Sequence, residues 1–337
     1  CVLPAGLGQA PARQAALGAD LPLAAGCTTI NKMCGSGMKA VMDAHDQIKA
    51  GSAKIMVAGG MENMSQSPYL LPKARGGMRM GHGQVIDSMF FDGLEDAYEG
   101  GLMGSFAQKS ADDFTVTRET MDDFAIESLT RAKRAISAGD FEAEIAPVSI
   151  KTRSGEQLVS IDEQPGNANM DKIRQLRPAF KKDGTVTAAN SSSISDGAAA
   201  LILMSESDAL ARGLTPLARI VGHSTHAQKP AEFTIAPIGS IQKLLHNIGW
   251  SKEQVDLYEI NEAFAVVTLL AIQELGLDAA KVNVNGGACA LGHPIGCSGA
   301  RILVSLLYAL QQQGKKRGVA SLCIGGGEAT AVAIELI

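Results

Sequence analysis

A cysteine directly precedes a glycine-serine-glycine segment in the stretch NKMCGSGMKAV, residues 31–41. If residues 35–37 open a helix, the Cys34 sulfur lies near the positive end of the helix dipole, which favours the nucleophilic thiolate. The glycines leave room for an acyl group and for backbone N–H donors to approach the sulfur. A small buried residue at a helix start is the simpler interpretation. Cys34 is therefore a candidate nucleophile, and Cys297, in GHPIGCSGAR, is its direct rival.

His293 stands between a glycine and a proline in ALGHPIG, where the backbone largely sets the direction of the ring. An imidazole held in this way could act as a catalytic base or could donate a hydrogen bond to a developing oxyanion. A loop histidine bonded to a backbone carbonyl is the structural alternative. Cys289, His293 and Cys297 also have a spacing that zinc could use. A closed zinc site needs four ligands, however, and no clear fourth lies nearby, so we expect no metal here.

Two further segments combine a predicted strand end with side chains or backbone groups that could do chemistry. Cys323 lies in LCIGGG, where the following glycines, Gly325 among them, offer unobstructed N–H groups to an anion. Asn261 lies in EINEAFA, at a predicted junction between a strand and a helix. Ligands of α/β proteins gather at the carboxyl ends of strands, so both segments are candidates for a site. A buried strand cysteine and a helix-capping asparagine are the plain alternatives.

The composition restricts the class of protein. The chain has 337 residues, of which 46% are hydrophobic and 19% charged, as expected for a globular protein with two or three packed lobes. A net charge of −5 provides no basic face for phosphates, so we expect no nucleic-acid partner. No apolar run has the length of a membrane span, and the six scattered cysteines do not form a secreted disulfide pattern. We therefore predict a cytoplasmic protein without membrane association.

Two stretches share one order of predicted elements, residues 28–60 and residues 281–327. Each predicts a short strand, a glycine-rich turn, an amphipathic helix and an apolar strand that stops at glycines. The helices start alike, with SGMK at residues 36–39 and SGAR at residues 298–301. Units of this kind imply parallel strand pairing with helices on the sheet faces. The sequence thus predicts a duplicated α/β core.

The segment between the two copies, residues 64–194, has a different pattern. It begins with SQSPYLLPKARGGMRMGHGQ, which is rich in glycine, methionine and positive charge. It then predicts a helix over TRETMDDFAIESLTRAKRAISAG, capped by Thr117 or Thr120 and ended by Gly139. Further amphipathic helices are predicted in GSIQKLLHNIGWS and NEAFAVVTLLAIQELGL. We interpret residues 64–194 as an insertion over the core, because loops of this size are usually functional.

Together, these motifs resemble the thiolase family. NKMCGSGMKA, NEAFA, GHPIG followed by SGAR, and CIGGG occur in the family's order and spacing. GLGQAPARQAAL and LRPAFKKDGTVTAANSSSISDGAA extend the similarity over essentially the whole chain. The resemblance implies an α/β fold: a duplicated thiolase-like core of mixed sheets and helices in αβαβα layers, plus an inserted loop domain. It implies an incomplete amino-terminal half over residues 1–63, completed by 195–213, a loop domain over 64–194, and a carboxy-terminal half over 214–337.

The chain departs from the family in two places. It lacks roughly the first fifty residues of a usual thiolase, including one strand of the amino-terminal sheet, and we expect an unpaired hydrophobic edge there. In EGGLMG, Leu102 stands where many acetoacetyl-CoA-specific members have a histidine near the acyl pocket. The acyl-chain length therefore stays open.

The resemblance assigns catalytic roles residue by residue. It places the acyl-carrying nucleophile on Cys34, because Cys297 falls where the family varies. His293 would take the thiol proton of Cys34, and Cys323 would take a proton from the α-carbon of a second acetyl-CoA. The resulting carbanion attacks the acyl-cysteine and yields a 3-ketoacyl-CoA, and thiolysis by CoA is the reverse. Such a covalent mechanism implies ping-pong kinetics.

The resemblance also implies two oxyanion holes. His293 and a water held by Asn261 would form one, and the backbone N–H groups of Cys34 and Gly325 would form the other. Four positions match residues that line the family's pantetheine tunnel: Ser192, Phe180, Ala263 and Phe264.

The implied ligands are coenzyme A thioesters, and no metal or redox cofactor is required. The CoA phosphates have only loose candidates among the lysines and arginines of residues 172–182. The segment from about residue 68 to residue 86 corresponds to a loop that ties family tetramers together. We expect a homotetramer, with a homodimer as the alternative.

We therefore expect an acetyl-CoA C-acetyltransferase, which condenses two acetyl-CoA to acetoacetyl-CoA and CoA or runs the reverse thiolysis. A 3-ketoacyl-CoA thiolase of broader chain length, acting in fatty-acid β-oxidation, is one alternative. A non-catalytic thiolase-like protein that binds acyl-CoA is another, although binding alone needs none of Cys34, His293 and Cys323. A decarboxylating ketosynthase of the same fold would use two histidines, which the cysteine of CIGGG disfavours.

Overall fold

The computed structural model describes residues 1–153 and 155–337. Its α-helices are, in chain order, α1 (Pro11–Gly18), α2 (Ser36–Lys49), α3 (Met103–Asp113), α4 (Arg118–Ala138), α5 (Glu163–Asn167), α6 (Glu206–Ala211), α7 (Ala236–Ile248), α8 (Ala265–Leu275), α9 (Ala288–Leu291) and α10 (Ile295–Gln312). Its strands are β1 (Ile55–Asn63), β2 (Tyr69–Leu70), β3 (Ile86–Asp87), β4 (Val148–Thr152), β5 (Gly155–Val159), β6 (Asp196–Met204), β7 (Ala218–Ala227), β8 (Leu257–Ile260), β9 (Arg317–Ile324) and β10 (Glu328–Leu336).

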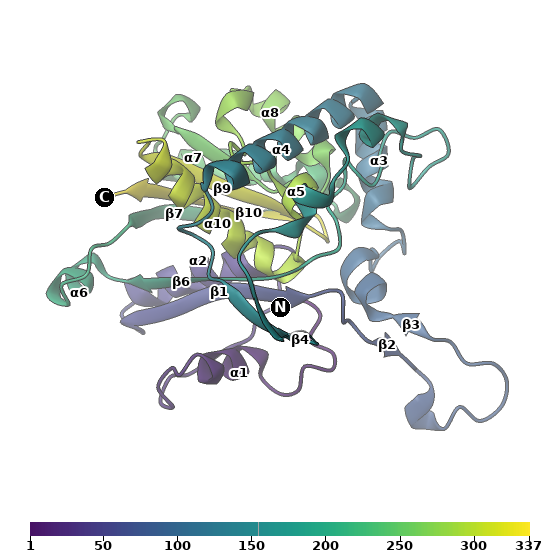
Figure 1. Cartoon of the computed structure of the whole chain (residues 1–337), viewed down its shortest axis with the longest axis horizontal. Helices are drawn as coiled ribbons and strands as arrows, with labels where there is room; N and C mark the ends of the chain where they lie inside the picture. Colours follow the sequence, from purple (N-terminus) through teal and green to yellow (C-terminus); the bar gives the residue numbers. More distant parts are fainter. Residues whose placement is uncertain (154) are drawn as a thin grey trace.

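Helices and sheets alternate in layers. In Figure 1, α7 and α8 lie above a sheet with the strand order β7-β10-β9-β8, and α2 and α10 lie beneath that sheet. The sheet of β1 and β6 follows, and the short helix α1 lies beyond it. The predicted layered α/β fold of mixed sheets is confirmed. In the described part of the chain, no helix combines the length and the apolar surface that a bilayer-spanning segment requires.

Strand pairing is mostly antiparallel, and this corrects the expectation of parallel units. Among the strands of the described residues, only β8 and β9 pair in parallel, while β10 pairs antiparallel with both β9 and β7, and β1 pairs antiparallel with β6. In each copy the strand that follows the long helix pairs antiparallel with a later strand. In the first copy β1 pairs with β6, and in the second β9 pairs with β10. The duplication is therefore preserved in the pairing of the last two strands of each half.

The prediction of a short strand at the start of each copy is wrong, because an asparagine turn forms there in both copies. Asn283 has a φ of 48°, and its side chain bonds both the N–H and the C=O of Ile260 at 2.8 Å, so an isolated bridge replaces a ladder. In the first copy Asn31 accepts a hydrogen bond from the N–H of Met33 at 2.9 Å, and Met33 has a φ of 47°. An asparagine turn thus interrupts each extended run before the helix.

The two long helices meet at their amino-terminal turns. A Cβ on Gly37 would lie 2.8 Å from the backbone nitrogen of Ala300, and a Cβ on Gly299 would lie 2.5 Å from the backbone nitrogen of Met38. Such distances leave no room for a side chain, so this close approach requires glycine on both helices. Behind the contact, apolar residues of both helices form the largest buried cluster: Met38, Val41, Met42, Ile302, Leu303, Leu306 and Leu310. The contact brings the start of α2 beside the start of α10.

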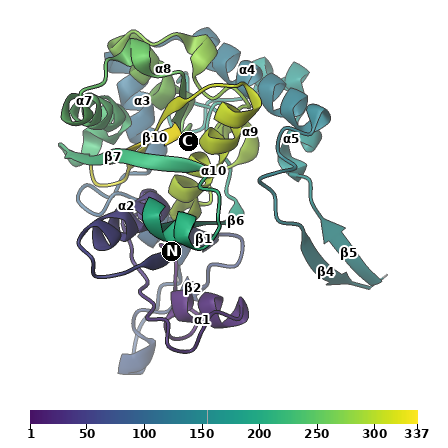
Figure 2. The ribbon, with the colours of Figure 1, turned by 90° about the vertical axis from the view of Figure 1, so that its left-hand side faces the viewer.

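The inserted segment covers one side of this core. Helix α4 begins after Thr117, whose side chain accepts a hydrogen bond from the N–H of Thr120, and it ends at Gly139, which has a φ of 76°. The predicted bounds of this helix are confirmed. The hairpin of β4 and β5 extends away from the body, as Figure 2 shows. Phe264 is extended and caps α8, so that helix starts later than the pattern NEAFAVV suggests.

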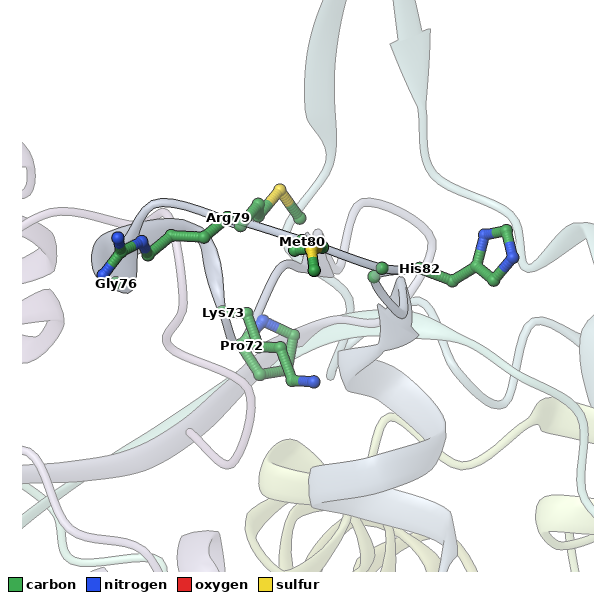
Figure 3. Close-up of a pocket in the computed structure, with 9 residues that line it drawn as sticks. Pro72, Lys73, Gly76, Arg79, Met80 and His82 are labelled. Carbon is green, nitrogen blue, oxygen red and sulfur yellow. The ribbon is translucent and has the colours of Figure 1, made fainter.

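A second projection lies between β2 and β3, at residues 71–85. Its tip surrounds a small hollow, and Figure 3 shows the side chains of Arg79 and His82 extending from the loop. Met80 is 95% exposed there. The sheet of β1 and β6 has two strands in the described residues, and Ile202 is 70% exposed on it. Ile202 is one of the side chains that face solvent along β6, and the expected unpaired edge stays a prediction.

Candidate active site

A tight turn presents Cys34 ahead of α2. The backbone N–H of Lys32 donates to the Ser36 hydroxyl at 2.9 Å, and that hydroxyl donates to the carbonyl of Met33 at 2.7 Å. Met33 adopts a left-handed conformation, which reverses the chain just before the cysteine. Ser36 is fully buried, so the turn is locked by its hydroxyl. Cys34 consequently leads into the first turn of α2 with its side chain in a cavity.

The cavity has a volume of ≈ 250 Å³ and collects the chemically active side chains. Cys34 from the start of α2, His293 from the loop before α10, and Cys323 and Gly325 from the end of β9 all line it. These residues are separated by up to 291 positions in the sequence (325 − 34), yet they share one cavity. The rest of the wall is largely apolar, as a site for an acyl chain requires: Met64, Phe90, Leu94, Leu102, Met103, Phe233 and Ile295.

Burial has the largest effect on the pKa of the Cys34 thiol. It raises the pKa of Cys34 to about 11, although backbone hydrogen bonds from Gly325 and from Cys34 itself favour the thiolate. The expectation that the helix start makes this thiol acidic is therefore wrong, because desolvation outweighs the nearby N–H groups. A neutral thiol needs a base in order to attack.

His293 is suited to be that base. Burial, and then the positive charge of Arg301, lower the pKa of His293 to about 3, so the imidazole is neutral at physiological pH. Its backbone N–H lies 3.2 Å from the Ser195 hydroxyl, which fixes the loop. A neutral imidazole has one nitrogen free to accept a proton, and which nitrogen is free depends on its hydrogen-bond partners.

Ser298 is the partner that decides this, and the sequence did not reveal its role. The Nδ1 atom of His293 lies 2.5 Å from the Ser298 hydroxyl, and this hydroxyl lies 3.0 Å from the carbonyl oxygen of Pro294. If the hydroxyl donates to Pro294, it accepts from Nδ1–H and leaves Nε2 as a base. If it donates to Nδ1 instead, Nε2 carries the hydrogen and becomes a donor. One hydroxyl thus supports both tautomers.

Asn261 lies beside the imidazole. Its Nδ2 atom is 3.4 Å from Nδ1 and 3.5 Å from Nε2 of His293, and its Oδ1 atom is buried without a hydrogen-bond partner. Buried acceptors are usually satisfied, so an orphaned one marks a place for water or for a ligand. The predicted neighbourhood of Asn261 and His293 is observed, and Asn261 stands behind the cavity wall rather than in it.

Cys323 occupies the end of β9 and is 1% exposed. Burial raises the pKa of its thiol well above the ordinary value, and the negative charge of an ionised Cys34 raises it further. Gly326 and Gly327 have φ values of 91° and 85°, so the chain turns sharply into β10 and Gly325 faces the cavity. The two thiols are therefore electrostatically coupled, and all cysteines of the described chain are free.

The four residues predicted to line a pantetheine tunnel all line this same cavity. Ser192 donates from its backbone and its hydroxyl to the carbonyl of Ala263, at 3.0 and 2.9 Å. Phe180 and Phe264 meet edge to face with ring centroids 6.2 Å apart. The geometry brings these residues together in the cavity wall, and Ala263 and Phe264 belong to the same apolar cluster as Cys323.

The cysteine-histidine spacing considered for zinc does not gather ligands. The sulfur of Cys289 lies 3.9 Å from the carbonyl of Glu262, while Cys297 is buried near Glu62. Among the described residues, the side chains that do converge in a metal-like group are others, namely His45, Asp46 and His223.

Two buried glutamates hold the loops of the site, and sequence reasoning missed this role. Glu62 accepts hydrogen bonds from the backbone N–H groups of Val2, Leu3 and Gly296, at 2.8, 3.1 and 2.8 Å. Glu262 accepts from the Ser128 hydroxyl at 2.7 Å and from the N–H of Cys289 at 3.0 Å. Their partners are distant in sequence and are mostly backbone groups, so no residue pattern identifies them.

Comparisons with known proteins agree with this geometry. Residues 1–207 match the family described as "Thiolase, N-terminal domain", and residues 214–336 match "Thiolase, C-terminal domain". The chain is 52% identical to acetyl-CoA acetyltransferase 2 of Arabidopsis thaliana, over 100% of this chain and 84% of that protein. It is also 52% identical to acetyl-CoA acetyltransferase of Escherichia coli, over 99% and 85%.

Two solved structures are similar throughout. The acetyl-CoA acetyltransferase of Bacillus anthracis superposes with a TM-score of 0.96 and 45% identity, over 99% of this chain and 85% of that one. The Acat5 thiolase of Ascaris suum, solved in complex with coenzyme A, gives a TM-score of 0.94 and 43% identity, over 100% and 86%.

Proposed function

Since the chain belongs to the thiolase family, we propose that it is an acetyl-CoA C-acetyltransferase, an acyltransferase that condenses two acetyl-CoA to acetoacetyl-CoA and CoA and also runs the reverse thiolysis. The observation that carries the proposal is the meeting of Cys34, His293 and Cys323 in one largely apolar cavity. Identity of about half the residues with several acetyl-CoA acetyltransferases supports the same activity.

In the first half-reaction Cys34 is the nucleophile. Nε2 of His293 accepts the thiol proton while the sulfur attacks the thioester carbonyl, so a free thiolate need not accumulate at a group whose pKa is about 11. The backbone N–H groups of Cys34 and Gly325 stabilise the oxyanion of the tetrahedral intermediate. His293 then returns the proton to the departing CoA sulfur. The products are acetyl-Cys34 and CoA.

In the second half-reaction Cys323, as the thiolate, accepts a proton from the methyl carbon of a second acetyl-CoA. Burial is the main cause of the raised pKa of Cys323, and acetylation keeps Cys34 uncharged, so no negative charge on Cys34 opposes this ionisation. The enolate oxygen receives hydrogen bonds from Nε2–H of His293 and from a water held by the free Oδ1 of Asn261. The carbanion attacks acetyl-Cys34, forms the carbon–carbon bond and releases the Cys34 sulfur, which takes up the proton held by Cys323, so that both cysteines return to their starting states.

The Ser298 hydroxyl can support His293 in both half-reactions. His293 must offer a bare Nε2 to Cys34 but an Nε2–H to the enolate, which are opposite tautomers. Ser298 accommodates each by accepting from Nδ1 or by donating to it.

Coenzyme A binding uses the part of the cavity wall that the predicted pantetheine residues form. Ser192, Phe180, Ala263 and Phe264 line the cavity and would contact the pantetheine, and the family relative solved with coenzyme A supports this ligand. The reaction requires no metal or redox cofactor.

A homotetramer, joined through the projecting segment of residues 68–86, and a cytoplasmic location also belong to the proposal. We further propose halves over residues 1–63 with 195–213 and over 214–337, with 64–194 as the loop domain. The pairing of β6 with β1 supports the return of the chain to the first half.

A 3-ketoacyl-CoA thiolase of broader chain length is the second candidate, because the apolar Leu102 lines the cavity. A thiolysis assay separates the two candidates. Purified protein receives free CoA with acetoacetyl-CoA or with longer 3-ketoacyl-CoAs, and we expect the four-carbon substrate to give the highest kcat/KM. A preference for long chains contradicts the acetyltransferase assignment. Cys34→Ser should abolish turnover and acetyl labelling, and a variant that still transfers acetyl groups contradicts the assigned nucleophile.

A further inference from the structure

A cluster of two histidines and an aspartate lies outside the cavity, between the two halves of the molecule. His45 and Asp46 belong to the last part of α2, and His223 belongs to β7. Figures 1 and 2 both show α2 beside β7, on the side of the upper sheet that faces the lower one. His45 lies nine positions after the first residue of α2, which is about 14 Å along a helix axis. The cluster is therefore remote from Cys34.

The three side chains converge on one point. Oδ1 of Asp46 lies 2.9 Å from Nδ1 of His45 and 2.9 Å from Nε2 of His223. All three potential ligand atoms lie within 4.8 Å of one another, and the imidazole rings stand at 88° with centroids 5.1 Å apart. The histidine side chains are 15% and 17% exposed, whereas Asp46 is 58% exposed. The cluster is thus preformed at its base and open to solvent on one side.

From this convergence we propose that His45, Asp46 and His223 bind one divalent transition-metal ion of the zinc type. Two imidazole nitrogens and one carboxylate oxygen are ligands that zinc prefers, and the open side leaves a position for water. Calcium and magnesium prefer oxygen ligands, so this donor set selects against them.

The protonation states favour binding. Partial burial raises the pKa of Asp46, but hydrogen bonds from His223 and then His45 outweigh it and bring that pKa below the ordinary value, so the carboxylate is ionised. Each ring nitrogen that now donates to Asp46 gives up this hydrogen in order to coordinate. A neutral imidazole can carry the hydrogen on its other nitrogen instead, so no proton has to leave the site.

The metal would join elements that are distant in sequence. Asp46 and His223 lie 177 positions apart, on a helix of the first half and a strand of the second. An ion held by both binds the folded state and not the unfolded chain, so it stabilises the fold by mass action. The proposed ion stabilises the fold through an open site with three protein ligands, and the catalytic mechanism does not depend on it.

The test uses zinc and cobalt ions added to chelator-treated, full-length protein. We expect the wild type to bind one zinc ion per chain. His223→Ala and His45→Ala should lose this ion or bind it at least about 100-fold more weakly, because even changes outside the ligand shell lower metal affinity by about 10- to 100-fold. Saturating zinc should raise the melting temperature of the wild type and leave that of His223→Ala unchanged. His246→Ala, which removes an exposed histidine from α7, is the matched control and should behave as wild type.

The cysteines are the competing ligands, and cobalt distinguishes them. Cobalt at the proposed site should give visible absorption without a thiolate charge-transfer band, and Asp46→Ala should weaken that absorption. A thiolate band that persists in His223→Ala, equal zinc binding by His223→Ala and wild type, or no zinc binding by the wild type overturns the proposal.

Discussion

The Ser298 hydroxyl lies 2.5 Å from Nδ1 of His293 and 3.0 Å from the carbonyl oxygen of Pro294. Both residues belong to the segment that starts α10, and the side chain of a helical residue points back over the preceding turn. The serine thus reaches the imidazole five positions earlier. The Ser298 hydroxyl therefore lies on the Nδ1 side of His293, where it can set the tautomer of this proposed base without contacting the substrate.

Removing this hydroxyl should slow catalysis without abolishing it. We expect Ser298→Ala to lower kcat of thiolysis by about 10- to 100-fold, since mispositioned general bases forfeit part of a contribution of about 10²–10⁴. KM for CoA should change little, because Ser298 is fully buried and does not line the cavity. The pH profile of kcat should shift, because Nδ1 loses the partner that sets its protonation.

Ser305→Ala is the control for this prediction. It also removes a buried hydroxyl from α10, but that hydroxyl bonds Glu144 rather than the imidazole. Equal effects of the two substitutions on kcat, with no change in either pH profile, would assign Ser298 a merely structural role.

The Cys34 thiol should be slow to alkylate at neutral pH. Because burial raises its pKa to about 11, the thiolate fraction grows about tenfold per pH unit below that value. We expect the rate at which iodoacetamide modifies Cys34, measured by peptide mass spectrometry, to rise continuously from pH 7 to pH 9. This range lies about 2 to 4 units below the pKa of the thiol. A rate that is already constant above neutral pH would mean that the helix start does lower the pKa and that burial does not dominate.

Filling the contact between the two long helices should destabilise the protein. Gly299→Ala puts a methyl group 2.5 Å from the backbone nitrogen of Met38, where neither helix can yield locally. Overpacking of this kind costs about 1–3 kcal/mol, which denaturant unfolding measures. Gly18→Ala is the control, because a Cβ at Gly18 meets nothing within 4 Å and the residue lies in helix α1. Equal unfolding free energies for the two variants would contradict the requirement for glycine at this contact.

The sequence was sufficient to select side chains that meet in one cavity, but not to predict what holds them there. Cys34, His293 and Cys323 each lie in a motif whose residue types are restricted by chemistry, so the resemblance identified them, and they share one cavity. Thr117 caps the start of α4 and Gly139 caps its end, as expected, because helix capping depends on residues that are neighbours in the sequence. Local patterns of this kind survive in almost any tertiary context.

The missed features depend on contacts across the fold. The asparagines at positions 31 and 283 replaced expected strands with turns, since their side chains compete with the sheet for backbone groups. The raised pKa of Cys34 comes from burial by residues that are remote in the sequence, which a helix-dipole argument omits. In the sequence Ser298 is part of a repeated helix start, and only the folded chain brings its hydroxyl to the imidazole of His293.

Cys323 should be needed for one half-reaction only. Cys323→Ala removes the proposed base for the proton of acetyl-CoA, while Cys34, His293 and the N–H groups proposed for the first half-reaction remain. We expect thiolysis of acetoacetyl-CoA to fall by at least about 10²-fold, since general bases contribute about 10²–10⁴. Acetylation of Cys34 by acetyl-CoA, followed by intact-protein mass and by exchange of isotopic CoA into acetyl-CoA, should stay within a few-fold of wild type.

This outcome also tests the charge coupling between the two sulfurs. An ionised Cys34 raises the pKa of Cys323, so the interaction must act in both directions. Without the second thiol, the alkylation rate of Cys34 should be unchanged or slightly higher at each pH. If Cys323→Ala instead loses CoA exchange together with thiolysis, while its melting temperature matches wild type, the second cysteine takes part in acyl transfer itself. The division of labour between the two thiols would then be wrong, whichever of them carries the acetyl group.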